Sequence, residues 1–162
     1  MQSWSHTAGV VLKTEARKKN GQGRIAIIAG SRSDIKIVEQ TSQTLSLLGI
    51  DHEVKFISAH RSPEQLRKFI LASKVDLFIG IAGLSAQLPG FIASITSRPV
   101  IGVPVSVKLG GLDALLAIVQ MPSRVPVACV GIDNGKNAAI LAGEILALKY
   151  PPLLNKVKNI RK

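Results

Sequence analysis

The most constraining feature of the sequence is a regular alternation between short apolar runs and longer amphipathic segments. The first run, Ile25–Ala29, is continuously apolar and stops at Gly30. A strand without polar alternation is typical of a parallel sheet that is covered by helices on both faces. The next segment begins with Ser33 and Asp34, has apolar residues at helical spacing and ends at Gly49, which together predict a helix.

Four more units of strand and helix follow. The expected strands are Glu53–Ile57, Leu77–Ile81, Val100–Val103 and Val127–Gly131, and the expected helices start at Ser62-Pro63 or cover Pro89–Ser97, Leu112–Gln120 and Asn137–Leu148. Short connections and right-handed crossovers then predict an α/β fold, a three-layer α/β/α sandwich around a five-stranded parallel sheet with flavodoxin-like strand order. Beyond Pro151-Pro152, residues Leu153–Arg161 are expected to add a C-terminal helical extension.

The basic charge of the chain lies mostly at its two ends. The formal net charge is +11, of which residues 1–24 carry +4 and residues 149–162 carry +5, so that only +2 remains for residues 25–148. We therefore expect an N-terminal extension over 1–23 that is disordered, an α/β catalytic domain over 24–148 and a basic helical tail over 149–162. Because the charge is not a stripe on the folded face, neither nucleic acid nor a membrane surface is expected as a partner.

The composition of the chain excludes several further classes of protein. Cys129 is the single cysteine, which excludes an intramolecular disulfide framework and a cysteine-rich zinc site, and it is expected to be a small buried hydrophobe. The longest apolar stretch, Leu77–Leu84, is far shorter than the about 18 residues that span a bilayer. The first 23 residues also lack the apolar core of a secretory signal. A cytoplasmic protein is expected.

Four loops rich in small and polar residues follow expected strands. They are Gly30–Asp34, Ser58–Ser62, Ala82–Gln87 and Ser106–Gly111. Because ligands of open parallel sheets bind where the carboxyl ends of the strands meet the helix N-termini, these loops are predicted to form one site.

The first loop is suited to an anion. It offers Ser31, Ser33 and backbone amides at the start of a helix, where the helix dipole favours a phosphate. The loop is neither a dinucleotide fingerprint nor a Walker motif, so neither a dinucleotide nor a nucleoside triphosphate is indicated. Asp34 either accepts hydrogen bonds from a ribose diol or is a plain helix N-cap.

The second loop supplies the charged and titratable groups. Arg61 is a forked, permanently charged donor suited to phosphate, and His60 exchanges a proton near neutral pH. Alternatively, Arg61 pairs with Asp34 or Glu64 and His60 caps a helix, whereas His52 is expected to be a solvated residue of an edge strand. Since no zinc-ligand spacing or nucleophilic triad is present, the inventory favours proton transfer on a phosphorylated substrate without a metal or other cofactor.

Seven short motifs occur in the order and spacing of one family. They are Gly30-Ser31-Arg32-Ser33-Asp34, Ser58-Ala59-His60-Arg61, Leu88-Pro89-Gly90, Pro99–Val105, Gly111-Leu112-Asp113, Ile118–Pro122 and Asn137-Ala138-Ala139. Over residues 24–160 the chain resembles the catalytic subunit of phosphoribosylaminoimidazole carboxylase, the family of N5-carboxyaminoimidazole ribonucleotide mutases of purine biosynthesis.

The resemblance implies a cofactor-free enzyme that moves a carboxylate from the exocyclic nitrogen of an aminoimidazole ribotide to ring carbon C4, by decarboxylation and recarboxylation. It implies His60 as general acid and base, Ser31 and Asp34 as ribotide ligands with Ser33 beside them, and Arg61 as the phosphate ligand. The base and carbon dioxide would contact Ser58, Ala59, Gly83, Ser85, Gln87 and Leu88. The family further implies a homo-octamer whose C-terminal segment reaches a neighbouring subunit.

The third loop departs from the family pattern. Relatives usually have Gly-Gly-Ala-Ala-His before the Leu-Pro-Gly motif, whereas this chain has Gly83-Leu84-Ser85-Ala86-Gln87. Gln87 cannot titrate. Arg61 is typical of the mutase branch, because the branch that carboxylates directly with carbon dioxide has lysine at this position. Direct carboxylation and a non-catalytic ribotide-binding homologue remain as alternatives.

Overall fold

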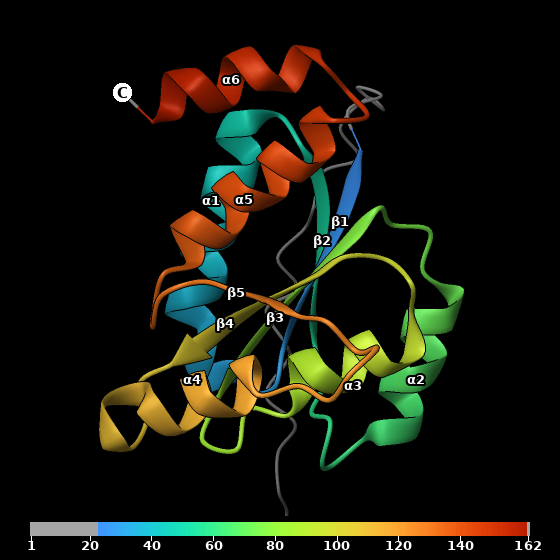
Figure 1. The fold of residues 1–162 in the computed structure, drawn as a ribbon, viewed down its shortest axis with the longest axis vertical. Coiled ribbons are helices and arrows are strands. Elements are labelled where there is room, and N and C mark those ends of the chain that lie inside the picture. Colours follow the sequence, from blue (N-terminus) through green and yellow to red (C-terminus); the bar gives the residue numbers. More distant parts are fainter. Residues whose placement is uncertain (1–22, 162) are drawn as a thin grey trace, which may run out of the picture.

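The computed structural model describes residues 23–161 and contains a parallel sheet of five strands. The strands are β1 (Arg24–Ala29), β2 (Asp51–Phe56), β3 (Leu77–Gly83), β4 (Val100–Val105) and β5 (Ala128–Cys129). Their order in the sheet is β2-β1-β3-β4-β5, and every neighbouring pair is parallel (Figure 1). The predicted flavodoxin-like fold is confirmed.

Helices cover both faces of the sheet. They are α1 (Ile35–Leu48), α2 (Pro63–Ala72), α3 (Leu88–Ile95), α4 (Leu112–Val119), α5 (Gly135–Ala147) and α6 (Pro152–Ile160), with short 3-10 turns η1 (Arg32–Asp34) and η2 (Leu109–Gly111). One face of the sheet packs against α1, α5 and α6, and the other packs against α2, α3 and α4. The predicted three layers are therefore present.

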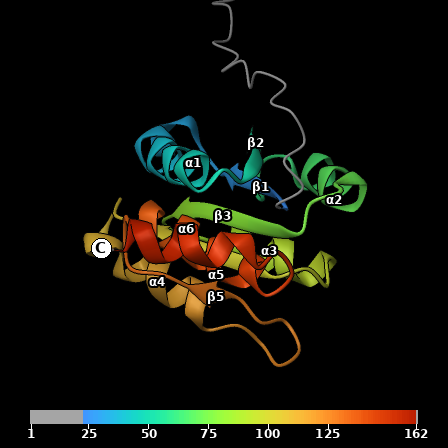
Figure 2. The same cartoon turned by 90° about the horizontal axis from the view of Figure 1, so that it is seen from above.

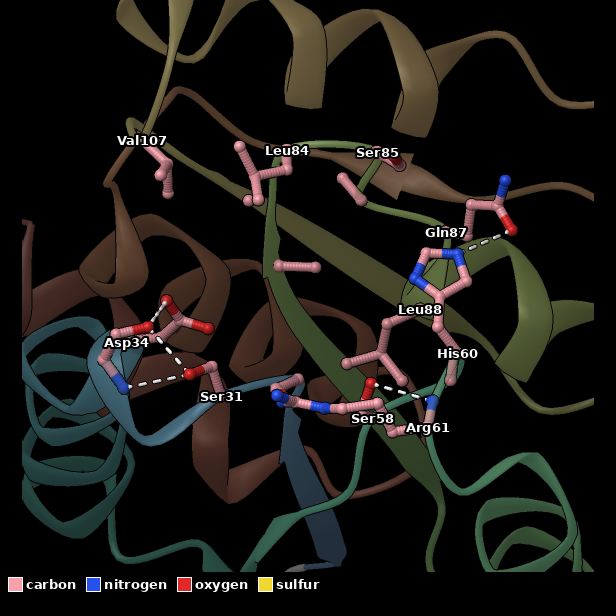
Figure 3. Close-up of a pocket in the computed structure, with 16 residues that line it drawn as sticks. Ser31, Asp34, Ser58, His60, Arg61, Leu84, Ser85, Gln87, Leu88 and Val107 are labelled. Atoms are coloured by element: carbon pink, nitrogen blue, oxygen red, sulfur yellow. Dashed lines mark hydrogen bonds between the residues drawn. The ribbon is translucent and has the colours of Figure 1, made fainter.

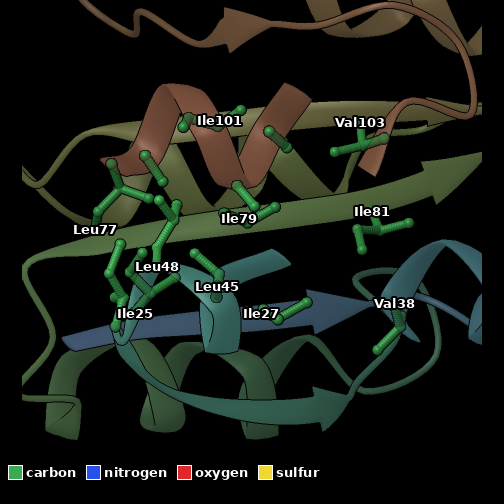
Figure 4. Packing of buried hydrophobic residues seen from close by; sticks show 14 of the residues in the cluster. Ile25, Ile27, Val38, Leu45, Leu48, Leu77, Ile79, Ile81, Ile101 and Val103 are labelled. Carbon is green, nitrogen blue, oxygen red and sulfur yellow. The ribbon is translucent and has the colours of Figure 1, made fainter. Parts of the chain in front are cut away.

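Successive residues of each central strand point into different cores. Ile25 and Ile27 of β1 pack with Leu45 of α1 in the first core, whereas Ala26 and Ile28 join the second core under α2 and α3. Figure 4 shows the first core, in which Ile27, Leu45 and Ile79 have no exposed surface. Since burying one such side chain stabilises a fold by about 1.5–3 kcal/mol, the sheet needs its unbroken apolar runs.

The expected C-terminal helix is present as α6 and packs on its own chain. Leu153 and Val157 are buried in the same core as α1 and α5, and Arg161 is 2.6 Å from the carboxylate of Glu144 on α5. Figure 2 shows α6 lying over α5. The extension predicted for 1–23 lies, apart from Gly23, outside the described residues.

Three local predictions need correction. The last strand is only Ala128–Cys129, because Pro126 precedes it without an N–H donor and β5 is an edge strand paired only with β4. His52 does lie on the edge strand β2, but it is half-buried: its Nε2 is 2.6 Å from Ser42 Oγ and its Nδ1 is 3.1 Å from the Ile50 carbonyl oxygen. Cys129 is half-buried rather than buried, and burial raises the pKa of its thiol.

Other boundaries differ by one or two residues. The helix α5 begins at Gly135, because the Asn134 side chain caps it by accepting a hydrogen bond from the Asn137 backbone N–H at 3.0 Å. The strand β2 begins at Asp51, directly after Gly49 ends α1 with a φ of 72°. Glycine suits this left-handed conformation, as the sequence predicted.

Candidate active site

A pocket of about 370 Å³ opens at the carboxyl ends of β1, β2 and β3. It is lined by all the residues singled out from the sequence, which are Ser31, Ser33, Asp34, Ser58, Ala59, His60, Arg61, Gly83, Ser85, Gln87 and Leu88. The further lining residues are Gly30, Ala82, Leu84, Ala86 and Val107. Figure 3 shows Ser31 and Asp34 on one side of the pocket, with His60 and Gln87 on the other.

The loop after β1 turns into α1 through a network of hydroxyl groups. The Ser31 Oγ accepts a hydrogen bond from the Ser33 backbone N–H at 3.2 Å and lies 2.9 Å from the Ser33 Oγ. The Ser31 side chain caps η1. Asp34 occupies the N-cap position of α1, but its side chain makes no capping hydrogen bond. The Asp34 carboxylate is thereby directed to the pocket instead of the helix.

Asp34 is the buried ionisable group of this pocket. Only 5% of the residue is exposed, and its Oδ1 accepts a hydrogen bond from the Ser33 hydroxyl at 3.1 Å. Burial raises the pKa of the Asp34 carboxyl, and hydrogen bonds from the Ser33 side chain and the Ser31 backbone offset only part of this rise. An ionised Asp34 therefore lacks solvation that hydroxyl groups of a bound ligand could supply.

The loop after β2 is fixed to the loop after β1. The Arg61 Nη2 donates to the Gly30 carbonyl oxygen at 3.1 Å, and the Arg61 backbone N–H donates to Ser58 Oγ at 3.3 Å. Among residues 23–161, Arg61 forms no ion pair with Asp34 or Glu64. The N-cap position of α2 belongs to Ser62, so His60 is not the cap either.

His60 contacts the loop after β3. Its Nε2 is 3.1 Å from the Gln87 Oε1, and both residues are exposed at the pocket wall. Figure 3 shows that the other ring nitrogen, Nδ1, points into the pocket. The chain thus presents one imidazole nitrogen to a ligand while the second is bound to an amide.

The loop after β3 forms an apolar wall with strained backbone. Leu84 and Ala86 have φ angles of 55° and 38°, and the Ala86 N–H closes the turn onto the Gly83 carbonyl oxygen at 3.1 Å. A Cβ on Gly83 would lie 2.5 Å from Val107 Cγ2, so any side chain at this position would displace Val107. Figure 3 shows Leu84 and Val107 side by side along this wall.

The loop after β4 contributes less than predicted. Only Val107 of this loop lines the pocket. Ser106 is turned away, because its backbone N–H donates to the Asp133 Oδ1 at 2.9 Å and its hydroxyl donates to the other oxygen of that carboxylate. Leu84 was named from the sequence only as part of the loop that departs from the family pattern, and Val107 was not named individually.

The pocket chemistry consists of an imidazole, a guanidinium, a buried carboxyl and several hydroxyl groups. Within residues 23–161, no cluster of three or more His, Cys, Asp or Glu side chains could hold a metal ion. Every helix of this part of the chain is too short or too polar to cross a membrane. The arrangement can bind a phosphorylated anion and move a proton.

The fold and the pocket define a flavodoxin-like α/β protein with a candidate ligand site at the carboxyl edge of its sheet. The family model described as AIR carboxylase matches residues 24–162, and the chain belongs to this family. The resemblance predicted from the motifs is therefore confirmed.

Proteins with similar sequences include N5-carboxyaminoimidazole ribonucleotide mutases from several organisms. The chain is 56% identical to the N5-carboxyaminoimidazole ribonucleotide mutase of Methanocaldococcus jannaschii over 85% of this chain and 87% of the relative. It is 47% identical to the mutase of Thermotoga maritima over 85% of this chain and 83% of that protein. The crystal structure of Treponema denticola PurE superposes with a TM-score of 0.76 at 30% identity, covering 85% of this chain and 89% of that one.

Proposed function

We propose that the protein is an N5-carboxyaminoimidazole ribonucleotide mutase of purine biosynthesis. The observation that carries the proposal is the position of His60 in the pocket, with Nδ1 directed inward and Arg61 and Asp34 along the same walls. The 56% identity to a curated mutase supports the same reaction.

The polar residues provide a way to hold the ribotide. The phosphate binds to the Arg61 guanidinium and to the hydroxyls and amides at the start of α1, where the helix dipole adds attraction. The ribose hydroxyls donate to the Asp34 carboxylate, whose lost solvation they replace. Ser31 and Ser33 lie beside both groups of the substrate.

The reaction needs one proton carrier. Protonated His60 donates a proton to the exocyclic nitrogen as the bond from nitrogen to the carboxyl carbon breaks, which releases carbon dioxide and aminoimidazole ribonucleotide. The ring carbon C4 then attacks the carbon dioxide, and neutral His60 removes the C4 proton. The proton that His60 gave is recovered, so the cycle closes without a cofactor.

The apolar wall keeps the two half-reactions together. Leu88 lies next to His60, and Leu84 and Val107 extend the apolar lining toward the Asp34 side; these side chains lack groups that would bind water or carbon dioxide by hydrogen bonds. Carbon dioxide released there stays close to C4, and the high effective concentration favours recapture over escape.

An oligomer fits the exposed apolar side chains of η2 and α4. Leu109 is 79% exposed, and Leu112, Leu116 and Val119 are between 45% and 52% exposed along one side of α4. A stripe of this kind is typical of a protein interface. We propose a homo-octamer, to be tested by light scattering coupled to size-exclusion chromatography.

We also propose a cytoplasmic location, because the charged ribotide would not cross a membrane unaided.

A comparison of substrates tests the proposed activity. The purified protein is offered either N5-carboxyaminoimidazole ribonucleotide or aminoimidazole ribonucleotide with bicarbonate. A mutase forms the C4-carboxylated product rapidly from the first substrate. Rapid product formation from the second mixture alone would favour direct carboxylation, a reaction kept open by the unusual third loop with Gln87. Ribotide binding without turnover of either would identify a non-catalytic homologue.

A further inference from the structure

The contact between His60 and Gln87 sets the orientation of the proton carrier. The Gln87 Oε1 lies 3.1 Å from the His60 Nε2. An amide oxygen only accepts hydrogen bonds, so the imidazole nitrogen that faces it must carry the hydrogen. The lone pair of neutral His60 is then on Nδ1, the nitrogen that points into the pocket (Figure 3).

We propose that Gln87 is a positioning residue that holds His60 in the tautomer with hydrogen on Nε2. The tautomer itself follows from the contact alone, whereas its catalytic consequence rests on the proposed function. In that reaction, Nδ1 of His60 gives the proton to the exocyclic nitrogen and later receives the C4 proton. Gln87 contacts neither reacting atom and acts only through the ring of His60.

The backbone on both sides of the contact is well anchored. Gln87 stands directly before α3, its carbonyl oxygen accepts from the Phe91 N–H at 2.9 Å, and its neighbours Ala86 and Leu88 are 3% and 2% exposed. The His60 loop is closed by the Ser62 N–H, which donates to the Ser58 carbonyl oxygen at 3.0 Å. Both side chains therefore extend from fixed positions.

His60 has few charged neighbours in the pocket that could fix its tautomer. The loop after β1 supplies Asp34, and the loop of His60 itself supplies Arg61. The loops after β3 and β4 bring no charged or titratable side chain to the lining; their polar residues are Ser85 and Gln87. Because the Gln87 amide does not titrate, it can present its oxygen to His60 at every pH.

Variants at Gln87 separate positioning from other roles, and the exposed side chain permits them without loss of the fold. Gln87→Glu keeps an acceptor, Gln87→Leu removes it, and Gln87→Lys replaces it with a donor. Nitrogen-15 NMR of histidine-labelled protein reads the tautomer without substrate. We expect hydrogen on Nε2 in the wild type and in Gln87→Glu, and hydrogen on Nδ1 in Gln87→Lys. The His52 signals, with their bonds to Ser42 and Ile50, serve as the internal control and should not move.

Kinetics provide the second readout. We expect kcat to fall about 10-fold or more in Gln87→Leu and Gln87→Lys, with KM changed less than about 3-fold, because proton transfer and not binding is affected. In Gln87→Glu the carboxylate favours protonated His60, the form that starts the proposed reaction, so the alkaline side of the pH–rate profile moves to higher pH.

Two results would overturn the inference. One is a set of His60 nitrogen signals that is the same in the wild type, Gln87→Leu and Gln87→Lys. The other is a kcat that does not respond to the change of tautomer. If the tautomer changes as expected but the wild type turns over neither substrate, the proposed function fails and the contact between Gln87 and His60 stands.

Discussion

Replacement of Asp34 by asparagine is expected to stabilise the fold and to weaken ligand binding. The side chain is buried, with 5% of the residue exposed, and accepts hydrogen bonds from the Ser33 hydroxyl at 3.1 Å and from the Ser31 backbone. Asparagine has nearly the same shape and retains an oxygen for Ser33, but it carries no charge. The variant therefore removes the cost of burying a carboxylate while leaving the packing in place.

The sign of the stability change follows from the raised pKa of the Asp34 carboxyl. Because the pKa in the folded state lies above the ordinary value of 3.8, the free energy of unfolding falls as the pH rises from 3.8 through that raised pKa. At pH values above that raised pKa the cost is present in the wild type, and Asp34→Asn should increase the free energy of unfolding there by about 1 kcal/mol. Below pH 3.8 both side chains are neutral, and the difference should nearly vanish.

Ribotide binding should change in the opposite direction. Hydrogen bonds to a charged group contribute about 1.5–3 kcal/mol each, so loss of the carboxylate should raise the Kd for aminoimidazole ribonucleotide roughly 30-fold. Urea unfolding at several pH values and isothermal titration calorimetry measure the two effects. A variant that is less stable at pH 7 and binds the ribotide as tightly as the wild type would refute the reasoning.

Asp76 provides the matched control for the stability measurement. Burial alone would raise the pKa of its carboxyl, but bonds from Lys149, the Arg24 backbone and Tyr150, together with the charge of Lys149, lower it. A lowered pKa means that Asp76 contributes stability above pH 3.8, which is lost as the pH falls through the pKa of the folded state. Asp76→Asn should therefore destabilise the protein at pH 7, opposite to Asp34→Asn.

Further substitutions test catalysis, the apolar core and backbone strain. His60→Asn should lower turnover by about 100-fold or more in the mutase assay, whereas Arg61→Ala should chiefly raise the Kd for the ribotide, by roughly 30-fold. Leu66→Ala removes a side chain with no exposed surface and should cost about 3 kcal/mol in urea unfolding, against less than about 0.5 kcal/mol for Leu71→Ala, which is 61% exposed in the same helix. Leu84→Gly relieves a φ of 55°, which costs leucine about 1 kcal/mol, and should leave the melting temperature unchanged or higher.

Each of these predictions has its own contradicting outcome. Equal loss of turnover and unaltered binding in both loop variants would remove the separate roles given to His60 and Arg61. A small loss in Leu66→Ala would mean that the second core tolerates a cavity. Leu84→Gly that melts well below the wild type would show that the leucine side chain stabilises more than its backbone conformation costs.

The sheet could be predicted because its signals are local. The unbroken apolar run of Ile25–Ala29 indicated a strand that is covered on both faces, and both of its faces are buried. Gly49 indicated the end of a helix, and its φ of 72° is the left-handed conformation that this role requires. The extent of β5 was overestimated, because apolar residues next to Pro126 resemble a longer strand while pairing depends on the neighbouring β4.

The residues around the pocket were predictable from the loops, but their mutual contacts were not. The bonds from Arg61 to Gly30 and from His60 to Gln87 join residues that are 31 and 27 positions apart. Such contacts depend on strand order and on the path of each loop, which no local pattern specifies. For the same reason the sequence did not decide whether Asp34 binds a ribose diol or caps a helix. The structure shows that its carboxyl makes no capping bond.

Transfer of a labelled carboxylate tests the central claim most directly. The protein is given N5-carboxyaminoimidazole ribonucleotide with carbon-13 in the carboxylate, in buffer that contains unlabelled bicarbonate, and the product is followed by NMR. If the apolar lining of Leu84, Leu88 and Val107 retains carbon dioxide in the pocket, the label should appear at the C4 carboxylate with little dilution. A product that carries mainly unlabelled carbon, or the absence of any C4-carboxylated product, would contradict the account.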